Sequence, residues 1–449
     1  MSADPSTEEE PHAGSLKQMA LRAASWSVGG RFLGQALRLL SNIVLARLLF
    51  PEAFGLMAIV AVFLYGLKMF SDLGIGPSIV YDARGEDDAF LDTAWTIQII
   101  RGAIITAGAL LIAWPVAQIY EEPQLTSLLV AAGFMGIIQG FESTSLYTEQ
   151  RKLMLGRVIQ LELLEQVLKF VVMVGWALVQ PTVWALVGGS LFGITSKTIL
   201  SHYYLPRRKH RLHWEPEAVR SVFQFGSWIF LSSIFTFVGV QGDRMLLGYY
   251  LGVGLLGVYH VATRFTESLG TLQGRLTRSV FFPVFSETFR SEPQYLVKRY
   301  YKTRLYMDLL FLSLAGVLGG AGGLIIGLLY DVRYSEAGWI LQALSIQVAM
   351  NIILTPAETL LFSIGKTFYA FARSFSKAVW IVVGIPLGWH LAGLPGVVWC
   401  VALSELPVLF VIWSGLVKER LFRPILELRS FAIWGAATAI AWLAVGVIQ

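Results

Sequence analysis

The sequence predicts an all-α membrane protein in which two six-helix transmembrane bundles, about 12–13 spans in all, surround a central cavity. The chain of 449 residues is 55% hydrophobic and only 14% charged, whereas soluble domains have about 25% charged residues. Apolar segments of about 20 residues, which cross the ~30 Å hydrocarbon core as helices, recur along the whole chain. Lysine and arginine cluster in alternate short connections, a pattern of membrane topology rather than of nucleic-acid binding.

The apolar segments predict the helices in order. They lie at 26–49, 54–80, 95–120, 124–148, 158–180, 183–205, 221–247, 255–283, 303–330, 335–364, 367–391 and 394–417. Short connections predict antiparallel neighbours. A further apolar run at 431–448 is either one more span or a peripheral helix.

Basic residues orient the predicted helices in the membrane. Lys17 and Arg22 precede the first helix, and the even-numbered connections carry Arg151, Lys152 and Arg157; Arg207, Arg208, Lys209 and Arg211; Arg290, Lys298, Arg299 and Lys302; and Lys418, Arg420, Arg423 and Arg429. The opposite connections are poor in lysine and arginine. By the positive-inside rule, the N-terminus and the even-numbered connections are cytoplasmic.

The most polar internal stretch, 206–220, divides the chain into two related halves. The predicted organisation is a cytoplasmic tail at 1–24, a six-helix bundle at 25–205, a basic cytoplasmic linker at 206–220, a second bundle at 221–417, and a basic loop with an additional apolar helix at 418–449. A faint repeat supports it, because 45–55 can be laid over 247–257 without gaps. Two such halves with a site between them near the midplane are a common transporter plan.

The first predicted helix carries a polar stripe that lipid cannot stabilise. Arg31, Gln35, Arg38 and Asn42 follow one another at i, i+4, i+7 and i+11, so they lie on one helical face. An arginine at the centre of a membrane helix costs about 2.5–3.5 kcal/mol on insertion scales. The stripe therefore faces protein or water. Arg31 can instead snorkel to the headgroups, and Arg38 can pair with a carboxylate elsewhere, but a hydrated cationic cavity for an anionic group is the functional interpretation.

The eighth predicted helix repeats this pattern. Arg264, Ser268, Thr271 and Arg275 again fall at i, i+4, i+7 and i+11. Glu267 follows Arg264 at i+3, so the two can neutralise each other. Even that pair requires surroundings other than lipid.

Four charged residues are candidates for coupling or gating: Lys68, Asp72, Glu267 and Glu405. Lys68 and Asp72 are spaced to pair along one helix. Glu405 has no cation within helical reach, so it is either a coupling carboxylate or the partner of a cation on another helix. Snorkelling is expected for Arg101. Interfacial positions are expected for Glu142, Glu162, Glu165, Asp243 and Arg244.

Several motifs carry no chemistry here. The segment 252–257 matches G-x-G-x-x-G but joins two membrane helices, and no phosphate-binding G-x-x-x-x-G-K-[ST] loop is present. Cys400 is the single cysteine, and His210 and His213 lack further ligands nearby, so neither a cofactor nor a metal site is predicted. No nucleophile motif occurs. The Gly-x-x-x-Gly pairs Gly136/Gly140 and Gly384/Gly388 predict close helix packing.

Stretches spread along nearly the whole chain resemble the polysaccharide-transporter (Wzx-like oligosaccharide flippase) family, within the larger group of MATE exporters and lipid II flippases. They are LARLLFPEAFGLMAI (45–59), SDLGIGPSIV (71–80), PTVWALVGGSLFG (181–193), GDRMLLGYYLGVGLLGVYHVATRF (242–265), FFPVFS (281–286) and LTPAETLLFSIGK (354–366).

This resemblance implies a MATE-like, alternating-access transporter of the bacterial inner membrane. Its cargo would be an undecaprenyl-pyrophosphate-linked oligosaccharide for O-antigen, capsule or exopolysaccharide biosynthesis, with membrane lipids, a proton or sodium ion, and polymerase and export machinery as further partners. Arg31, Arg38, Arg264 and Arg275 occupy places suited to a cationic cavity of this family. The extra apolar segment at the C-terminus departs from the family's even helix number.

Two other functions compete with a flippase. A cation-coupled exporter of amphipathic small molecules shares the fold, but it favours acidic and aromatic cavity residues over arginine stripes. A membrane polymerase or ligase needs a sizeable extracytoplasmic loop with catalytic residues, and the predicted loops are short. Arginine matches phosphate oxygens bidentately and stays charged, which supports the flippase.

Overall fold

The computed structural model describes residues 13–72, 74–152, 154–206 and 210–448. The predicted tail residues 1–12 and the linker residues Arg207, Arg208 and Lys209 lie outside the described residues. The described helices are α1 (Ala13–Leu48), α2 (Pro51–Phe70), α3 (Ile75–Tyr81), α4 (Asp88–Ile119), α5 (Gln124–Gly140), α6 (Ser145–Arg151), α7 (Leu155–Val179), α8 (Val183–Tyr203), α9 (Pro216–Leu276), α10 (Phe282–Ser291), α11 (Leu296–Leu329), α12 (Ala337–Ser363), α13 (Phe368–Ala402), α14 (Leu406–Lys418) and α15 (Pro424–Ile448).

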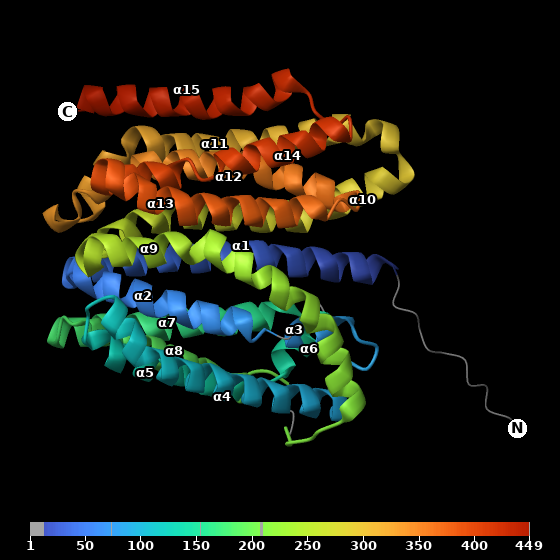
Figure 1. The fold of residues 1–449 in the computed structure, drawn as a ribbon. Helices are drawn as coiled ribbons and strands as arrows, with labels where there is room; N and C mark the ends of the chain where they lie inside the picture. The colour runs from blue at the N-terminus through green and yellow to red at the C-terminus, as the bar shows by residue number, and fades with distance from the viewer. Residues whose placement is uncertain (1–12, 73, 153, 207–209, 449) are drawn as a thin grey trace, which may run out of the picture.

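The helices run roughly side by side, with α1 and α9 between a group formed by α2–α8 and a group formed by α10–α15 (Figure 1). Several helix boundaries differ from the predictions, since α4 starts at Asp88 rather than at 95 and α11 at Leu296 rather than at 303. The first helix starts at Ala13, well before residue 26, and α9 starts at Pro216, so the last part of the predicted linker is helical.

Helix α9 is a hairpin rather than one straight rod. The Tyr259 hydroxyl donates to Asp243 Oδ2 at 2.7 Å, although the residues are 16 positions apart and would lie about 24 Å apart along a straight helix. The chain reverses at Gly252, whose φ of 72° and ψ of 173° are accessible mainly to glycine. The predicted break between 247 and 255 falls at this reversal.

Helix α13 folds back in the same way. Trp380 Nε1 donates to the Cys400 carbonyl at 2.8 Å across 20 positions, a distance of about 30 Å in a straight helix. The reversal lies at Gly393, with φ 60°, between the predicted helices 367–391 and 394–417. Close approach of the two arms depends on Gly384 and Gly388, where an added Cβ would overlap Cys400 and the Gly396 carbonyl.

Eight stretches of the described chain are long and apolar enough to cross a membrane. Two of them, 235–291 and 368–418, contain the hairpins, so each supplies two antiparallel helices. Helix α15 is among the eight, as residues 424–447. The protein is therefore an all-helical, multi-span membrane protein over its described residues.

Three predicted helices are interrupted. The segment 54–80 divides into α2 and α3, 124–148 divides into α5 and α6 with a bend of 58°, and 394–417 divides into the second arm of α13 and α14. Side chains of α4 satisfy carbonyls freed at the first two breaks: Arg101 donates to the Lys68 carbonyl at 2.8 Å, and Gln98 Nε2 donates to the Glu142 carbonyl at 2.9 Å. The expectation that Arg101 snorkels is wrong, because its guanidinium bonds to the end of α2 and lies 3.7 Å from Asp72.

The two halves meet through a reciprocal backbone contact between α2 and α9. A Cβ added to Gly55 would overlap the Val253 carbonyl, and a Cβ added to Gly257 would overlap the Pro51 carbonyl. The alignment of 45–55 with 247–257 places Gly55 on Gly257 and Pro51 on Val253, so the two contacts are equivalent. The faint sequence repeat thus corresponds to a two-fold-like contact, in which equivalent residues exchange roles.

The same end of the molecule is closed by bonds between the α1–α2 and α11–α12 connections. Arg47 donates to the Leu329 carbonyl at 3.2 Å, Arg333 donates to the Arg47 carbonyl at 3.3 Å, and the Tyr334 hydroxyl donates to the Leu49 carbonyl at 3.3 Å.

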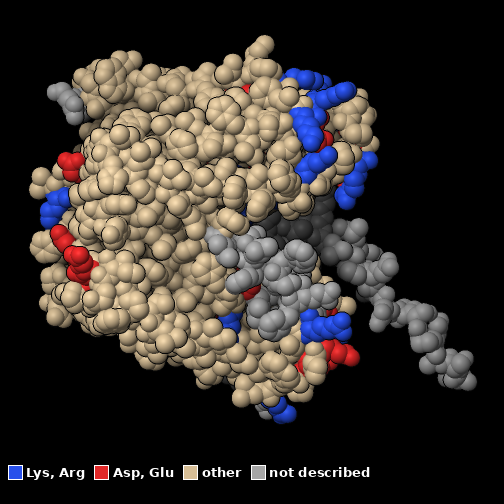
Figure 2. Space-filling model, viewed as in Figure 1, with Lys and Arg blue, Asp and Glu red and all other residues tan. Residues whose placement is uncertain are grey.

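At the opposite end, lysine and arginine gather on the surface, and a broad band between the ends carries almost no charge on the face shown (Figure 2).

Helix α15 lies at the edge of the molecule, against α11 (Figure 1). Gly316 and Gly320 of α11 allow this approach, since an added Cβ at either would overlap the α15 backbone or Ala437. Only 6% of the residues in the most apolar stretch of α15 are buried. The helix therefore packs at the periphery, although it is long enough to span the membrane.

Candidate functional site

A cavity of about 560 Å³ opens between α1, α7 and the second arm of α9. All six residues that the sequence singles out for substrate binding line it: Arg31, Gln35, Arg38, Asn42, Arg264 and Arg275. Ser268 also lines the cavity, whereas Thr271 does not, so the first stripe and three members of the second face one shared space.

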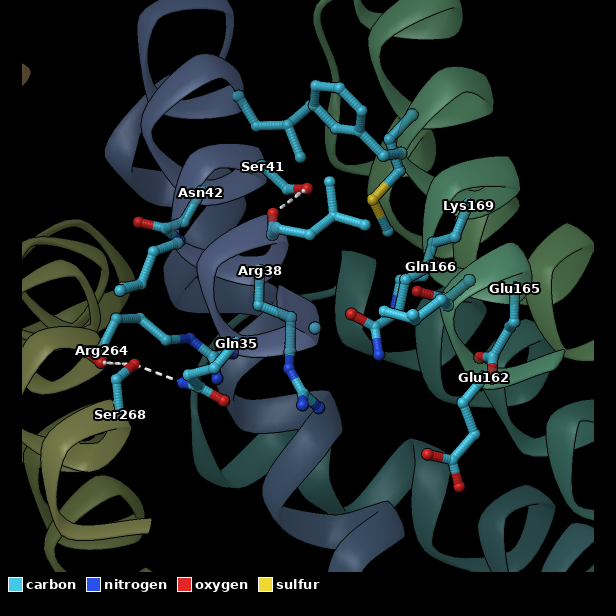
Figure 3. Close-up of a pocket in the computed structure, with 18 of the residues that line it drawn as sticks. Gln35, Arg38, Ser41, Asn42, Glu162, Glu165, Gln166, Lys169, Arg264 and Ser268 are labelled. Carbon is cyan, nitrogen blue, oxygen red and sulfur yellow. Dashed lines mark hydrogen bonds between the residues drawn. The ribbon is translucent and has the colours of Figure 1, made fainter. Parts of the chain in front are cut away.

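Hydrogen bonds fix the two stripes against each other. Gln35 Nε2 donates to Ser268 Oγ at 2.5 Å, and Ser268 Oγ donates to the Arg264 carbonyl at 2.5 Å, as the dashed lines in Figure 3 show. Deeper in the cavity, Asn42 Oδ1 accepts a bond of 2.8 Å from the Tyr330 hydroxyl. The polar side chains of α1 thus bind both α9 and α11, which joins the two halves around the cavity.

The cavity arginines are largely free of carboxylate partners. Among the described residues, no ion pair or hydrogen bond engages the guanidinium groups of Arg31, Arg38 or Arg275, which are exposed to the cavity. Arg264 donates to His260 Nε2 at 3.1 Å and lies 3.7 Å from Glu267. Four guanidinium groups with spare donors therefore line one cavity, and donors of this kind match the oxygen atoms of an anion.

Helix α7 forms the opposite wall, which the sequence interpretation missed. Glu162, Glu165, Gln166 and Lys169 all line the cavity, and Figure 3 shows them across from Arg264 and Ser268, with Arg38 between. The earlier expectation placed Glu162 and Glu165 in interfacial solvent. Their spacing of i, i+3, i+4 and i+7 is the signal that could have assigned them to one inward face.

Two further polar sites of the membrane helices, at Glu142 and at Asp243 with Arg244, have partners. Glu142, expected at the interface, is buried and lies 2.7 Å from Lys197 Nζ. Asp243 and Arg244, expected at headgroup level, lie inside the α9 hairpin, where Arg244 forms an ion pair with Glu267. The expected interfacial solvation of Glu142 is wrong, because its side chain is buried. The partners of Asp243 and Arg244 were not predicted, because an apolar sequence pattern does not show which polar side chains pair.

The pairing of Lys68 with Asp72 is also wrong for the described residues. Asp72 lies 3.7 Å from Arg101 and accepts a bond of 3.1 Å from the Gly74 amide. The break after α2 carries Asp72 away from the helical position that pairing with Lys68 requires. Neither residue lines the cavity.

Glu405 is fully buried in the C-terminal half and has cations on another helix. Its carboxylate lies 2.6 Å from Lys377 Nζ and 3.6 Å from Arg373 Nη2, both on the first arm of α13. Asn351 donates to it at 3.3 Å. Of the two alternatives for Glu405, this geometry matches the partner of a cation.

Three comparisons place this geometry among known proteins. A family described as "Polysaccharide biosynthesis protein" matches residues 44–338. Lipopolysaccharide biosynthesis protein WzxC of Escherichia coli (strain K12) is 22% identical over 388 residues, which cover 85% of this chain and 78% of that protein.

Solved transporters share the fold. The lipid II flippase MurJ in an inward closed conformation superposes with a TM-score of 0.74 at 13% identity, covering 94% of this chain and 92% of the other. An inward-facing multidrug resistance MATE family transporter of the MOP superfamily superposes with a TM-score of 0.64 at 13% identity, covering 89% and 95% of the two chains. These similarities show a MATE-like transporter fold.

Proposed function

The chain belongs to the polysaccharide biosynthesis protein family, and we propose that it is a flippase rather than an enzyme. Its cargo is an oligosaccharide linked to undecaprenyl pyrophosphate, which it carries from the cytoplasmic to the periplasmic leaflet of the bacterial inner membrane. The observation that supports this most directly is the cavity, because two arginine stripes from different halves face one space.

The physical problem is to move a pyrophosphate across a layer of low dielectric constant. A charge there is strongly penalised unless fixed charges of opposite sign replace water. Arg31, Arg38, Arg264 and Arg275 offer donors in the planar arrangement that binds phosphate oxygens bidentately. The lipid tail stays in the bilayer while the headgroup occupies the cavity.

The closed end of the molecule indicates the side from which an alternating-access transporter would receive its cargo. The bonds of Arg47 and Arg333 close the end opposite the basic surface. By the positive-inside rule, we place the basic end and the N-terminus in the cytoplasm, so the cavity described here receives cargo from inside. A proton or sodium ion drives the cycle, and Glu267 is the candidate coupling group joined to the cavity, through Arg264.

The alternative is a cation-coupled exporter of amphipathic molecules with the same fold. Glu162 and Glu165 on α7 favour it, since they are acidic residues that line the cavity. The unpaired arginines argue against this alternative, because they would repel a cationic drug.

Liposome transport separates the two functions. The protein is reconstituted with a fluorescent undecaprenyl-pyrophosphate trisaccharide in one leaflet, and its appearance in the other leaflet is followed with and without an ion gradient. Variants Arg38→Ala and Arg264→Ala are compared at matched folded amounts. The control is Arg290→Ala, whose side chain is 73% exposed and pairs with Glu287 outside the cavity.

We expect transport by wild type and by Arg290→Ala, and a loss of at least about tenfold in each cavity variant, corresponding to about 1.4 kcal/mol. Cavity variants that transport at the wild-type rate would show that the arginines are not needed, although the protein would still be a flippase. Wild type that moves no probe under any gradient would favour the exporter.

A further inference from the structure

The two walls of the cavity differ in chemistry. The wall from α1 and α9 presents arginines, whereas the wall from α7 presents two carboxylates, an amide and one ammonium group (Figure 3). The opposite face of α7 is apolar and exposed, with Val167, Val171 and Leu178 on it. The polar stripe of α7 is therefore directed to the cavity rather than distributed around the helix.

The carboxylates of this stripe make no direct bond to the described part of the chain, although Lys169 and Lys197 lie near enough to Glu165 to attract its charge. No described residue forms a hydrogen bond or ion pair with Glu162 or Glu165, although both line the cavity. Elsewhere in the bundle, Glu142 lies 2.7 Å from Lys197, and Glu427 lies 2.8 Å from Arg304. In addition, the side-chain oxygen of Gln166 is buried and lacks a hydrogen-bond donor among the described residues.

Three acceptor groups on one wall need donors from a ligand. Ionised carboxylates only accept hydrogen bonds, and such bonds to hydroxyl groups are among the stronger ones because the acceptor is charged. Sugar hydroxyls are donors that occur in pairs along a ring. The sugar carboxylate of a uronic acid, in contrast, has no proton to donate and would repel both glutamates.

We propose that the α7 wall is the glycan-selecting surface of the transporter, with Glu162, Glu165 and Gln166 accepting hydrogen bonds from the hydroxyls of uncharged sugars. The inference rests on the proposed function and adds the cargo class: an oligosaccharide whose sugars next to the pyrophosphate carry no anionic group. Lys169, at the end of the same stripe, donates to sugar oxygens.

Packing holds this wall against the pyrophosphate site. An added Cβ at Gly34 of α1 would lie 3.3 Å from the amide of Gln166, and one at Gly30 would overlap Ile159 of α7. Glycines in α1 thus bring α7 close to the helix that carries Arg31 and Arg38. A headgroup bound at the arginines therefore meets α7 with its first sugars.

Two probes test the selection. Both carry undecaprenyl pyrophosphate, and the trisaccharide is glucose in one and glucuronic acid in the other. Their transport rates in liposomes and their affinities for the detergent-solubilised full chain are measured for wild type and for the double variant Glu162→Gln/Glu165→Gln. Glu217→Gln is the control, since its side chain is 84% exposed and lies outside the cavity.

We expect wild type and the control to prefer the glucose probe by at least about tenfold in rate and affinity. We expect the double variant to bind and transport the glucose probe at least about threefold less well, because a neutral amide accepts weaker hydrogen bonds than a carboxylate, and to reduce the preference to about threefold or less, because the amides no longer repel the uronate. Matched unfolding temperatures show that the variant folds.

Other results overturn the inference and are distinguishable. Equal transport of both probes by wild type would support the flippase function but contradict selection by the α7 wall. A preference that survives in the double variant places it elsewhere, and a double variant that moves neither probe assigns the carboxylates to the transport cycle. Wild type that moves neither probe fails the proposed function itself.

Discussion

Gly55 and Gly257 contact each other's half of the protein in the same way. Gly55 lies against the Val253 carbonyl, and Gly257 lies against the Pro51 carbonyl, so the start of α2 and the tip of the α9 hairpin are packed backbone to backbone. Because these residues are equivalent in the internal repeat, the contact fixes how the halves are related. It also lies at the closed end, on which an alternating cycle must pivot or open.

We expect Gly55→Ala and Gly257→Ala to destabilise the protein by similar amounts, about 1–3 kcal/mol, because each methyl group overlaps a backbone atom that cannot rotate away. Chemical unfolding in detergent measures the change. Gly175→Ala is the control, since a Cβ there meets nothing within 4 Å and a helix-interior alanine favours the helix. A Gly257→Ala protein with the wild-type free energy of unfolding would contradict the close approach.

The fully buried contact of Arg304 with Glu427 fastens α15. Arg304 Nη1 lies 2.8 Å from Glu427 Oε1, Arg304 Nε lies 3.2 Å from Asp308, and the Tyr301 hydroxyl donates to Glu427 at 3.0 Å. We expect Glu427→Ala to cost about 3–5 kcal/mol, since it leaves a buried cation undercompensated. Loss of α15 should also make the chain after Lys418 sensitive to protease.

The matched control is Glu287→Gln, in an exposed pair with Arg290. This variant should unfold at the wild-type denaturant concentration, because exposed ion pairs contribute little. Similar behaviour of Glu427→Ala and Glu287→Gln would show that the α15 ion cluster does not hold the helix.

Periodicity predicted much of this site, because α-helical geometry alone places Arg31, Gln35 and Arg38 on one face and Arg264 and Arg275 on another. Their convergence needs only that the two helices pack along those faces. The sequence could not predict which acids are paired, since Lys377 reaches Glu405 from another helix. The break after α2 does have a signal, because residues 71–77 (SDLGIGP) combine polar residues with glycines and a proline. The sequence could not show that the bond satisfying the break comes from α4.

A double-mutant cycle distinguishes structural and coupling roles for Glu405. Glu405→Gln should lower stability by about 3 kcal/mol, since it leaves Lys377 and Arg373 facing a neutral group in a buried site. In combination with Lys377→Met, the loss should be smaller than the sum of the single losses, with a coupling energy of about 1–3 kcal/mol. Unfolding in detergent measures all four proteins.

Transport per folded molecule completes this test. If Glu405 serves only its ion cluster, the rate of Glu405→Gln stays near wild type at every pH and sodium concentration. A rate that loses its dependence on the ion gradient would instead make Glu405 a coupling carboxylate.

The closed end offers the last prediction. Arg47 bonds to the carbonyls of Leu328 and Leu329, and Arg333 bonds to those of Ala46 and Arg47. With each bond contributing about 0.5–1.5 kcal/mol, Arg47→Ala/Arg333→Ala should open this end at least about tenfold more often. The reporter is Ser41→Cys, which lines the cavity, in a Cys400→Ser background that has no other cysteine. A membrane-impermeant thiol reagent added from the Arg333 side should label it correspondingly faster, whereas Arg290→Ala should leave the labelling rate unchanged. Equal labelling of all three proteins would mean that the apolar contacts around Leu45 and Phe54, rather than these arginines, keep the cavity shut.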